Sequence, residues 1–86
     1  MTDYKIIFTR SARKELEALD ASLVNRIFPK IESLAVRPRP RSSRKLQREK
    51  DLWRIRVGDY RIIYTIDDEK LLVDTIAVRH RSEAYR

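Results

Sequence analysis

A chain of 86 residues, 42% apolar and 38% charged, makes a single domain (residues 1–86) that buries about 60% of the surface of its unfolded chain. The net charge of +7 predicts a polyanionic or acidic partner. No cysteine and one histidine argue against thiolate and histidine-built metal sites, so we expect neither a metal nor another cofactor.

The sequence has no segment of the kind that enters or crosses a membrane. No run approaches the ~20 apolar residues that a membrane-spanning helix needs, and the N-terminus lacks the apolar core of a secretory signal. The absence of cysteine also suits a reducing compartment. We therefore expect a cytoplasmic protein that does not bind a membrane.

The first third of the chain predicts a strand followed by two helices. Residues 4–9 have the β-branched and aromatic content of a strand, and Thr9 or Ser11 can cap the next helix. Asp20 is expected to cap a second helix, joined to the first by a short turn, so that the two form an antiparallel hairpin. Pro29 falls inside the second helix, where the apolar period continues on both sides, which predicts a kink and not a break.

The segment from Arg37 to Lys45 predicts a linker without regular structure, because two prolines and two serines interrupt it. It is strongly basic and leads directly into the next strands. We expect its cations to contribute to phosphate binding, the candidate RNA-binding residues being Arg37, Arg39, Arg41, Arg44 and Lys45.

The residues from Leu52 to Ile66 predict a β-hairpin. Apolar and polar residues alternate on both sides of Gly58-Asp59, which holds the only glycine of the chain, and such a pair favours a two-residue turn. That turn sets the register, with Arg56 opposite Arg61. One face is then apolar and is formed by Trp53, Ile55, Val57, Tyr60, Ile62 and Tyr64.

The other face of this hairpin gathers Arg54, Arg56 and Arg61. A single arginine there would be an ordinary solvated residue whose stem covers the sheet. Like charges placed directly opposite each other destabilise a sheet, so three converging arginines indicate a face reserved for a polyanion.

The last strand is expected over Leu71 to Val78, a nearly continuous apolar run after a polar turn. If Leu71 pairs with Ile66, strict alternation places Leu72, Ile76, Val78 and His80 on the arginine side and Arg81 on the opposite side.

These elements together predict an α+β fold. A strand, an α-helical hairpin and a three-stranded antiparallel meander form a four-stranded sheet with both helices packed on one face.

The order of elements, together with the hairpin from Trp53 to Tyr64 and the C-terminal segment from Val78 to Arg86, resembles the RelE/ParE toxin superfamily, and its RelE branch in particular. The resemblance implies the toxin of a type II toxin–antitoxin system, a ribosome-dependent endoribonuclease that cleaves mRNA in the decoding site and inhibits translation. It implies as partners mRNA on the ribosome, rRNA, and a cognate acidic, RelB-like antitoxin. The toxin would be a monomer when free and a hetero-oligomer with its antitoxin.

The same resemblance assigns roles to individual residues. Arg54 and Arg56 match a basic catalytic pair, and Arg61 matches an arginine that clamps the scissile phosphate. Arg81 matches the arginine that assists the leaving oxygen, and Tyr85 matches a tyrosine that stacks on the substrate base.

The expected chemistry is metal-independent attack of the 2′-OH on the adjacent phosphate. Arginines can neutralise the phosphorane, but they stay protonated at physiological pH and cannot serve as the base. Arg54 stands where the family often has a lysine, so two other candidates for the base remain open, His80 and Tyr85.

Two other functions fit the same sequence. A ParE-like inhibitor of DNA gyrase would share the fold without needing the arginine cluster. A non-catalytic RNA-binding module would bind with a steep dependence on salt but would cleave nothing.

Overall fold

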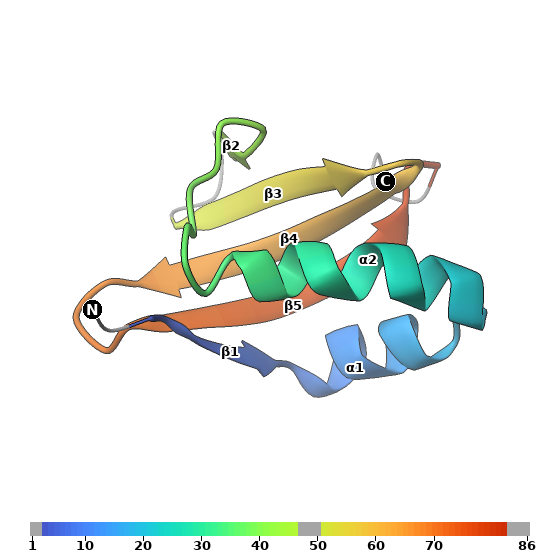
Figure 1. Ribbon diagram of the computed structural model, residues 1–86, viewed down its shortest axis with the longest axis horizontal. Helices are drawn as coiled ribbons and strands as arrows, with labels where there is room; N and C mark the ends of the chain where they lie inside the picture. Colours follow the sequence, from blue (N-terminus) through green and yellow to red (C-terminus); the bar gives the residue numbers. More distant parts are fainter. Residues whose placement is uncertain (1–2, 47–50, 83–86) are drawn as a thin grey trace.

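The computed structural model describes residues 3–46 and 51–82, which form a two-layer α+β domain (Figure 1). Both helices lie on one face of the sheet, as the sequence predicts. The elements in chain order are β1 (Lys5–Phe8), α1 (Arg10–Glu17), α2 (Ala21–Ser33), β2 (Arg44–Lys45), β3 (Leu52–Val57), β4 (Tyr60–Asp67) and β5 (Leu72–His80). Neither helix is long and apolar enough to cross a membrane within this described part of the chain.

The sheet has five strands in the order β1-β5-β4-β3-β2, one more than the sequence predicts. β1 is parallel to β5, and the other neighbours are antiparallel. The additional strand is β2, in which Arg44 pairs with Arg54 and Lys45 with Trp53, so the expected linker is wrong at its end. A strand of two basic residues shows no alternation of polar and apolar side chains, so its sequence does not predict it. It forms because its backbone pairs with the outer edge of β3.

Side-chain caps fix the start of both helices. Thr9 Oγ1 accepts a hydrogen bond from the amide of Ala12 at 3.1 Å, and Asp20 Oδ1 accepts one from the amide of Leu23 at 3.0 Å. The predicted caps at Thr9 and Asp20 are therefore confirmed. α2 continues through the exposed Pro29 without a break, and the kink at that residue stays a prediction.

The hydrophobic core lies between the helices and the apolar face of the β3–β4 hairpin, which we call the helix face. Val57 pairs with Tyr60 and Ile55 with Ile62, so the predicted register of the hairpin is confirmed. Leu34 and Tyr64 are both completely buried. The core cluster comprises Leu16, Ile27, Ile31, Leu34, Ile55, Ile62, Tyr64, Val73 and Val78.

The pairing of β4 with β5 differs from the expectation. Ile66 pairs with Val73, and a β-bulge interrupts the ladder between Ile63 and Tyr64. At this bulge β5 has one residue more than β4. The side chains of β5 beyond the bulge therefore point to the face opposite the one that strict alternation predicts. Val78 and His80 therefore oppose Ile62 and Tyr60 on the helix face, and their predicted position beside the arginines is wrong.

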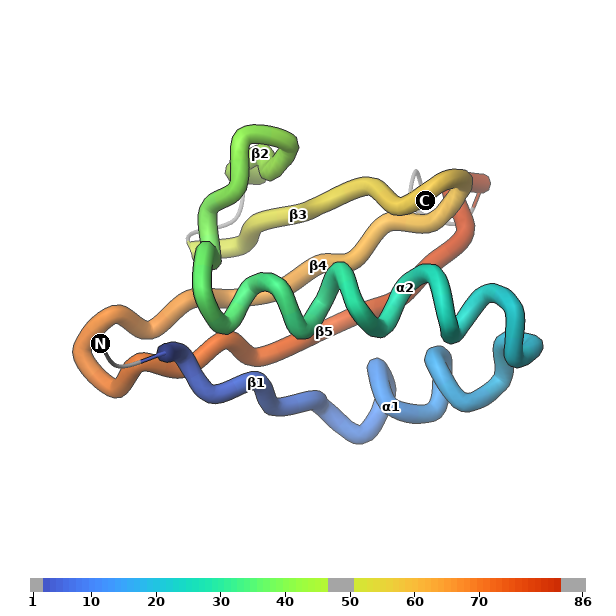
Figure 2. Tube along the Cα trace, in the orientation of Figure 1, coloured from blue at the N-terminus to red at the C-terminus, as the bar shows by residue number. Residues whose placement is uncertain are grey.

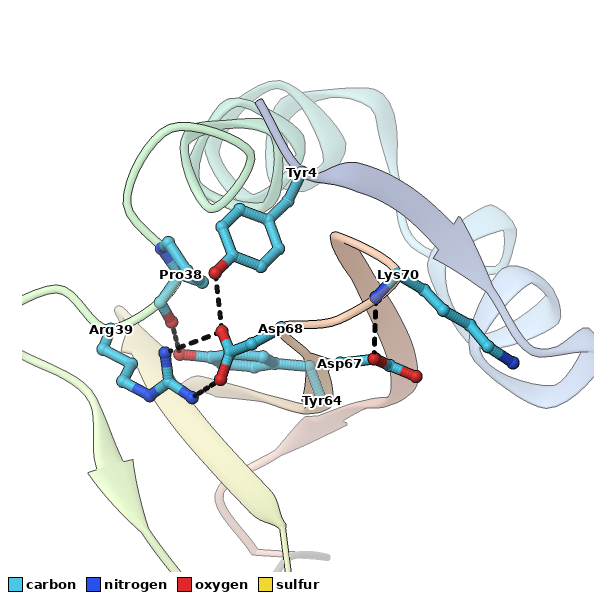
Figure 3. A network of polar contacts seen from close by, with 7 residues as sticks. All are labelled: Tyr4, Pro38, Arg39, Tyr64, Asp67, Asp68 and Lys70. Atoms are coloured by element: carbon cyan, nitrogen blue, oxygen red, sulfur yellow. Dashed lines mark hydrogen bonds and ion pairs between the residues drawn. The ribbon is translucent and has the colours of Figure 1, made fainter. Parts of the chain in front are cut away.

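A polar cluster attaches the loop after α2 to the turn between β4 and β5 (Figure 3). Arg39 donates two hydrogen bonds to the Asp68 carboxylate at 3.2 and 2.8 Å, and the Tyr4 hydroxyl donates a third at 2.6 Å. The guanidinium of Arg39 also lies 5.3 Å from the centroid of the Trp53 ring. We call Tyr4, Arg39 and Asp68 the Asp68 clasp.

A partly buried hydrogen bond between Tyr64 and Pro38 lies beside this clasp (Figure 3). The Tyr64 hydroxyl donates to the carbonyl oxygen of Pro38 at 2.8 Å, and burial raises the pKa of Tyr64 to about 12, so the hydroxyl stays a donor. Figure 2 shows the backbone leaving α2 and running to β2 at the edge of the sheet. The contacts of Pro38 and Arg39 lie on this connection, between α2 and Arg44.

The clasp predicts a loss of stability in acid. Hydrogen bonds from Arg39 and Tyr4 lower the pKa of Asp68 below its ordinary value. A carboxyl whose pKa is lower in the folded state stabilises the fold above its unfolded-state pKa, and this stabilisation disappears as the pH falls through the folded-state pKa. Asp68→Asn should therefore lower the free energy of unfolding near neutral pH and have less effect near pH 2, measured by urea denaturation.

Glu69→Gln provides the control, because Glu69 is an exposed carboxylate in the same turn. It should leave the difference between neutral and acid stability unchanged. An Asp68→Asn protein as stable as the wild type at neutral pH would contradict the role of the clasp.

Candidate active site

A cavity of about 570 Å³ lies on the face of the sheet opposite the helices, which we call the arginine face. It is lined by Arg56, Gly58, Asp59, Arg61, Arg81 and Ser82, and we call it the arginine pocket. Its three cations come from β3, β4 and the residue just beyond β5. Segments far apart in the chain thus converge on one concave, cationic surface.

The tight turn between β3 and β4 places Arg56 and Arg61 side by side. The two residues pair directly across the hairpin. Gly58 has a φ of +60°, a conformation that costs glycine little, and positive φ at the first turn position is typical of a type II′ turn. Arg56 is exposed, whereas Arg61 is only 7% exposed. The pocket therefore offers one exposed and one buried arginine side chain.

Arg81 reaches the pocket because the ladder continues past β5. Its backbone amide donates a hydrogen bond to the carbonyl oxygen of Asp59 at 2.7 Å. This bond ties residue 81 to the hairpin turn. The expectation that Arg81 lies on the face away from the arginines is therefore wrong, since the β-bulge exchanges the faces of residues 80 and 81.

His80 lies on the other side of the sheet. Its ring contacts Tyr60 edge-on, at 5.4 Å between centroids and 87° between planes. It lines a separate cavity of about 190 Å³ on the helix face, with Leu23, Arg26 and Ile27 of α2. The structure therefore does not bring His80 to the arginine pocket.

A second cationic cavity adjoins the arginine pocket. It has a volume of about 410 Å³ and is lined by Ser42, Arg44, Arg54 and Arg56. Arg56 lines both cavities, and Arg44 pairs with Arg54 across β2 and β3. Together they form one continuous surface, the arginine track, comprising Arg44, Arg54, Arg56, Arg61 and Arg81.

The remaining predicted RNA-binding residues do not line the track. Lys45 opposes Trp53 and therefore points to the helix face, and Arg39 is held in the Asp68 clasp. Arg37 and Arg41 are exposed but line neither cationic cavity. Only Arg44 of the five contributes to the track.

Tyr85 falls outside the described residues. The structure adds two pocket residues that the sequence analysis missed, Asp59 and Ser82. A further residue that the sequence analysis missed is Arg26, which lines the cavity on the helix face. Its guanidinium lies 3.1 Å from the position that a Cβ at Gly58 would take. Arg26 is one cation among several on an amphipathic helix, so nothing in the sequence singles it out.

The chemistry open to the arginine track is recognition of phosphates. Guanidinium groups bind phosphate oxygens through paired, charge-assisted hydrogen bonds and remain charged at any physiological pH. Within the part of the arginine pocket that the structure describes, Asp59 is the one carboxylate. The arrangement can therefore neutralise a developing negative charge, and its arginines cannot remove a proton.

Comparison with known proteins agrees with this geometry. Residues 6–85 match the family model described as ParE toxin of type II toxin–antitoxin system, parDE. The chain is 31% identical over 95% of its length to a putative RelE-like toxin protein of Escherichia coli, covering 90% of that protein. It is 32% identical over 96% of its length to Toxin RelG of Mycobacterium tuberculosis, covering 97% of that protein.

The same fold occurs in the crystal structure of the toxin–antitoxin complex RelBE2 from Mycobacterium tuberculosis. The TM-score is 0.81 at 32% identity, and the match covers 92% of this chain and 99% of that chain. The two-layer α+β fold is thus shared with a solved toxin–antitoxin complex. The chain belongs to the RelE/ParE superfamily of toxins of type II toxin–antitoxin systems.

Adjacent residues of β2 give a matched test of the track. Arg44 lies on the track and Lys45 on the opposite face, so Arg44→Gln should weaken binding of a short single-stranded oligoribonucleotide and Lys45→Gln should not. Loss of one phosphate contact should make the slope of log Kd against log salt shallower by about 0.7. Equal effects of the two substitutions, measured by titration over a range of KCl concentrations, would contradict the track.

Proposed function

We propose that this protein is a RelE-type mRNA interferase, a ribosome-dependent endoribonuclease that cleaves mRNA in the decoding site and thereby inhibits translation. The observation that carries the proposal is the convergence of Arg56, Arg61 and Arg81 on one pocket. An endoribonuclease must hold a scissile phosphate and stabilise the charge that develops on it. The names of its RelE-like relatives support the same activity.

The reaction would be metal-independent transesterification, in which the 2′-oxygen bonds to the phosphorus and the 5′-oxygen leaves. Arg61, confined in the pocket, would clamp the phosphate, while Arg54 and Arg56 would neutralise the phosphorane. Arg81 would stabilise the leaving 5′-oxygen. Together these residues supply the electrostatic part of the catalysis.

The base would be Tyr85, which the resemblance also assigns to stacking on the substrate base. His80 lies on the helix face, which leaves Tyr85 as the other candidate named from the sequence. As the base, Tyr85 would need a lowered pKa, which arginines brought close to its hydroxyl could provide. A weak base of this kind suits a ribosome-dependent enzyme, because a ribosome that orients the mRNA supplies part of the barrier reduction.

The proposed partners are mRNA and rRNA on the ribosome, and an acidic, RelB-like antitoxin that binds the arginine track. The net charge of +7 supports an acidic partner, and the matched RelBE2 structure is a toxin–antitoxin complex. The toxin would act in the cytoplasm, as a monomer when free and as a hetero-oligomer when inhibited.

A second function is favoured by the description of the matching family model, which names ParE. A ParE-type toxin would inhibit DNA gyrase without cleaving nucleic acid. The arginine pocket argues for the first function, because inhibition of gyrase does not need a phosphate-binding cluster of this kind.

Arg61→Met tests the proposal. Arg61 is buried, so Arg61→Ala would leave a cavity, whereas methionine keeps most of the stem. Removing this phosphate contact should reduce mRNA cleavage on purified ribosomes by about 10²–10³-fold. Arg13→Gln, on the exposed surface of α1, is the control and should cleave like the wild type.

The measurement is the mapping of mRNA 5′ ends after incubation with programmed ribosomes. Intact mRNA with the wild-type toxin, together with inhibited supercoiling by gyrase, would contradict the proposal and favour the ParE-type function. A folded Arg61→Met protein that cleaves at the wild-type rate would remove Arg61 from the mechanism.

The antitoxin proposal predicts competition. At one hundred times its Kd, an antitoxin that binds only the folded toxin should raise the free energy of unfolding by about 2.7 kcal/mol. It should also displace an oligoribonucleotide from the arginine track, measured by fluorescence anisotropy. A stable ternary complex of toxin, antitoxin and oligoribonucleotide would show that the antitoxin binds elsewhere.

A further inference from the structure

The contacts of His80 indicate its protonation state. Its Nδ1 lies 2.9 Å from Ser82 Oγ and accepts a hydrogen bond from the backbone amide of Ser82 at 3.2 Å. A backbone N–H can only donate, so this contact needs Nδ1 as its acceptor, which is the role of Nδ1 in the neutral tautomer with its proton on Nε2. The imidazole thus closes a short turn with Arg81 at its centre.

The ring of His80 packs against Tyr60 and borders a cavity. Tyr60 contacts its edge, and the cavity is also lined by Leu23, Ile27 and Val57. The charged and titratable groups around it are Arg26 from α2, Asp59 from the hairpin turn, Tyr60 from β4 and the neighbouring Arg81. The ring is therefore oriented by Tyr60 while its Nδ1 accepts the hydrogen bond from the Ser82 amide.

Arg81 is fixed on both sides by these contacts. Its own amide donates to the carbonyl oxygen of Asp59, and the next amide donates to His80 Nδ1. The two bonds set the backbone direction at residue 81, and with it the entry of the Arg81 side chain into the arginine pocket.

We propose that His80 is a positioning residue, which holds Arg81 in the arginine pocket through its neutral imidazole while lying on the opposite face of the sheet. This inference rests on the proposed function for its effect on cleavage, but the contact itself does not depend on that function. Protonation places a hydrogen on Nδ1, removes the acceptor for the Ser82 amide and frees the turn.

Cleavage should therefore fall in acid as His80 becomes protonated. A general base at position 80 would give the same pH profile, so the profile alone does not separate the two roles. The substitution His80→Asn does. The side-chain oxygen of an asparagine accepts a hydrogen bond from the amide two residues later, as in an Asx-turn, but it does not titrate and cannot act as the base.

His80→Asn should retain cleavage within a few-fold of the wild type and lose the fall in acid that His80 causes. His80→Phe keeps the edge contact with Tyr60 and removes the acceptor. It should lose about 10²-fold, since a displacement of about 1 Å in a catalytic group can cost this much. In an Arg81→Ala background, His80→Phe should cost nothing further, because both substitutions remove the same effect.

Nuclear magnetic resonance provides a readout independent of activity. In the wild type, the Ser82 amide and the Arg81 Nε–H resonances should shift with pH at the midpoint of the His80 ring, and in His80→Asn that transition should vanish. If the wild type cleaves no mRNA, the proposed function fails and these resonances still decide the positioning role.

Three outcomes would overturn the inference. The first is a folded His80→Phe protein with the rate and pH profile of the wild type. The second is His80→Asn as inactive as His80→Phe, which would indicate that the imidazole itself takes part in proton transfer. The third is a Ser82 amide resonance that does not respond to the titration of His80.

Discussion

The structure depends on the antiparallel pairing of β3 with β4, which forces two arginines to lie opposite each other. Like charges at Arg56 and Arg61 cost the sheet roughly 0.2–1 kcal/mol. The same register buries Ile55, Ile62 and Tyr64 on the helix face, and each such side chain contributes about 1.5–3 kcal/mol. Burial on one face therefore exceeds repulsion on the other, and the core supplies the free energy that holds a cationic surface together.

Carboxylates neutralise some of the basic side chains in the described part of the chain. Arg39 pairs with Asp68 away from the arginine track, and Arg79, which lies opposite Arg61 across β4 and β5, pairs with Glu15 of α1 at 3.2 Å. A track assembled in this way attracts mobile anions and counterions from solution. Binding of a nucleic acid or an acidic protein would release them, which is a favourable and salt-dependent contribution to affinity.

The sequence predicts the β3–β4 hairpin because apolar residues and arginines alternate along β3 and the single glycine marks the turn. It does not predict the position of β5. The run from Leu72 to Val78 is apolar on both faces, so no alternation marks its register, and the β-bulge leaves no signature in composition. The turn before it contains Leu71 at a φ of +55°, where a glycine would have been recognised. His80 and Arg81 were therefore assigned to each other's faces.

The pairing of β1 with β5 joins the two ends of the chain, since Lys5 lies beside Leu72 and Phe8 beside Thr75. These are contacts of high sequence separation, which form slowly and only after the intervening chain is available. During synthesis, β1 has no strand partner until β5 has been made. Arg81 is added later still. A chain that ends before β5 would thus lack the partner of β1 as well as the Arg81 side chain of the arginine pocket.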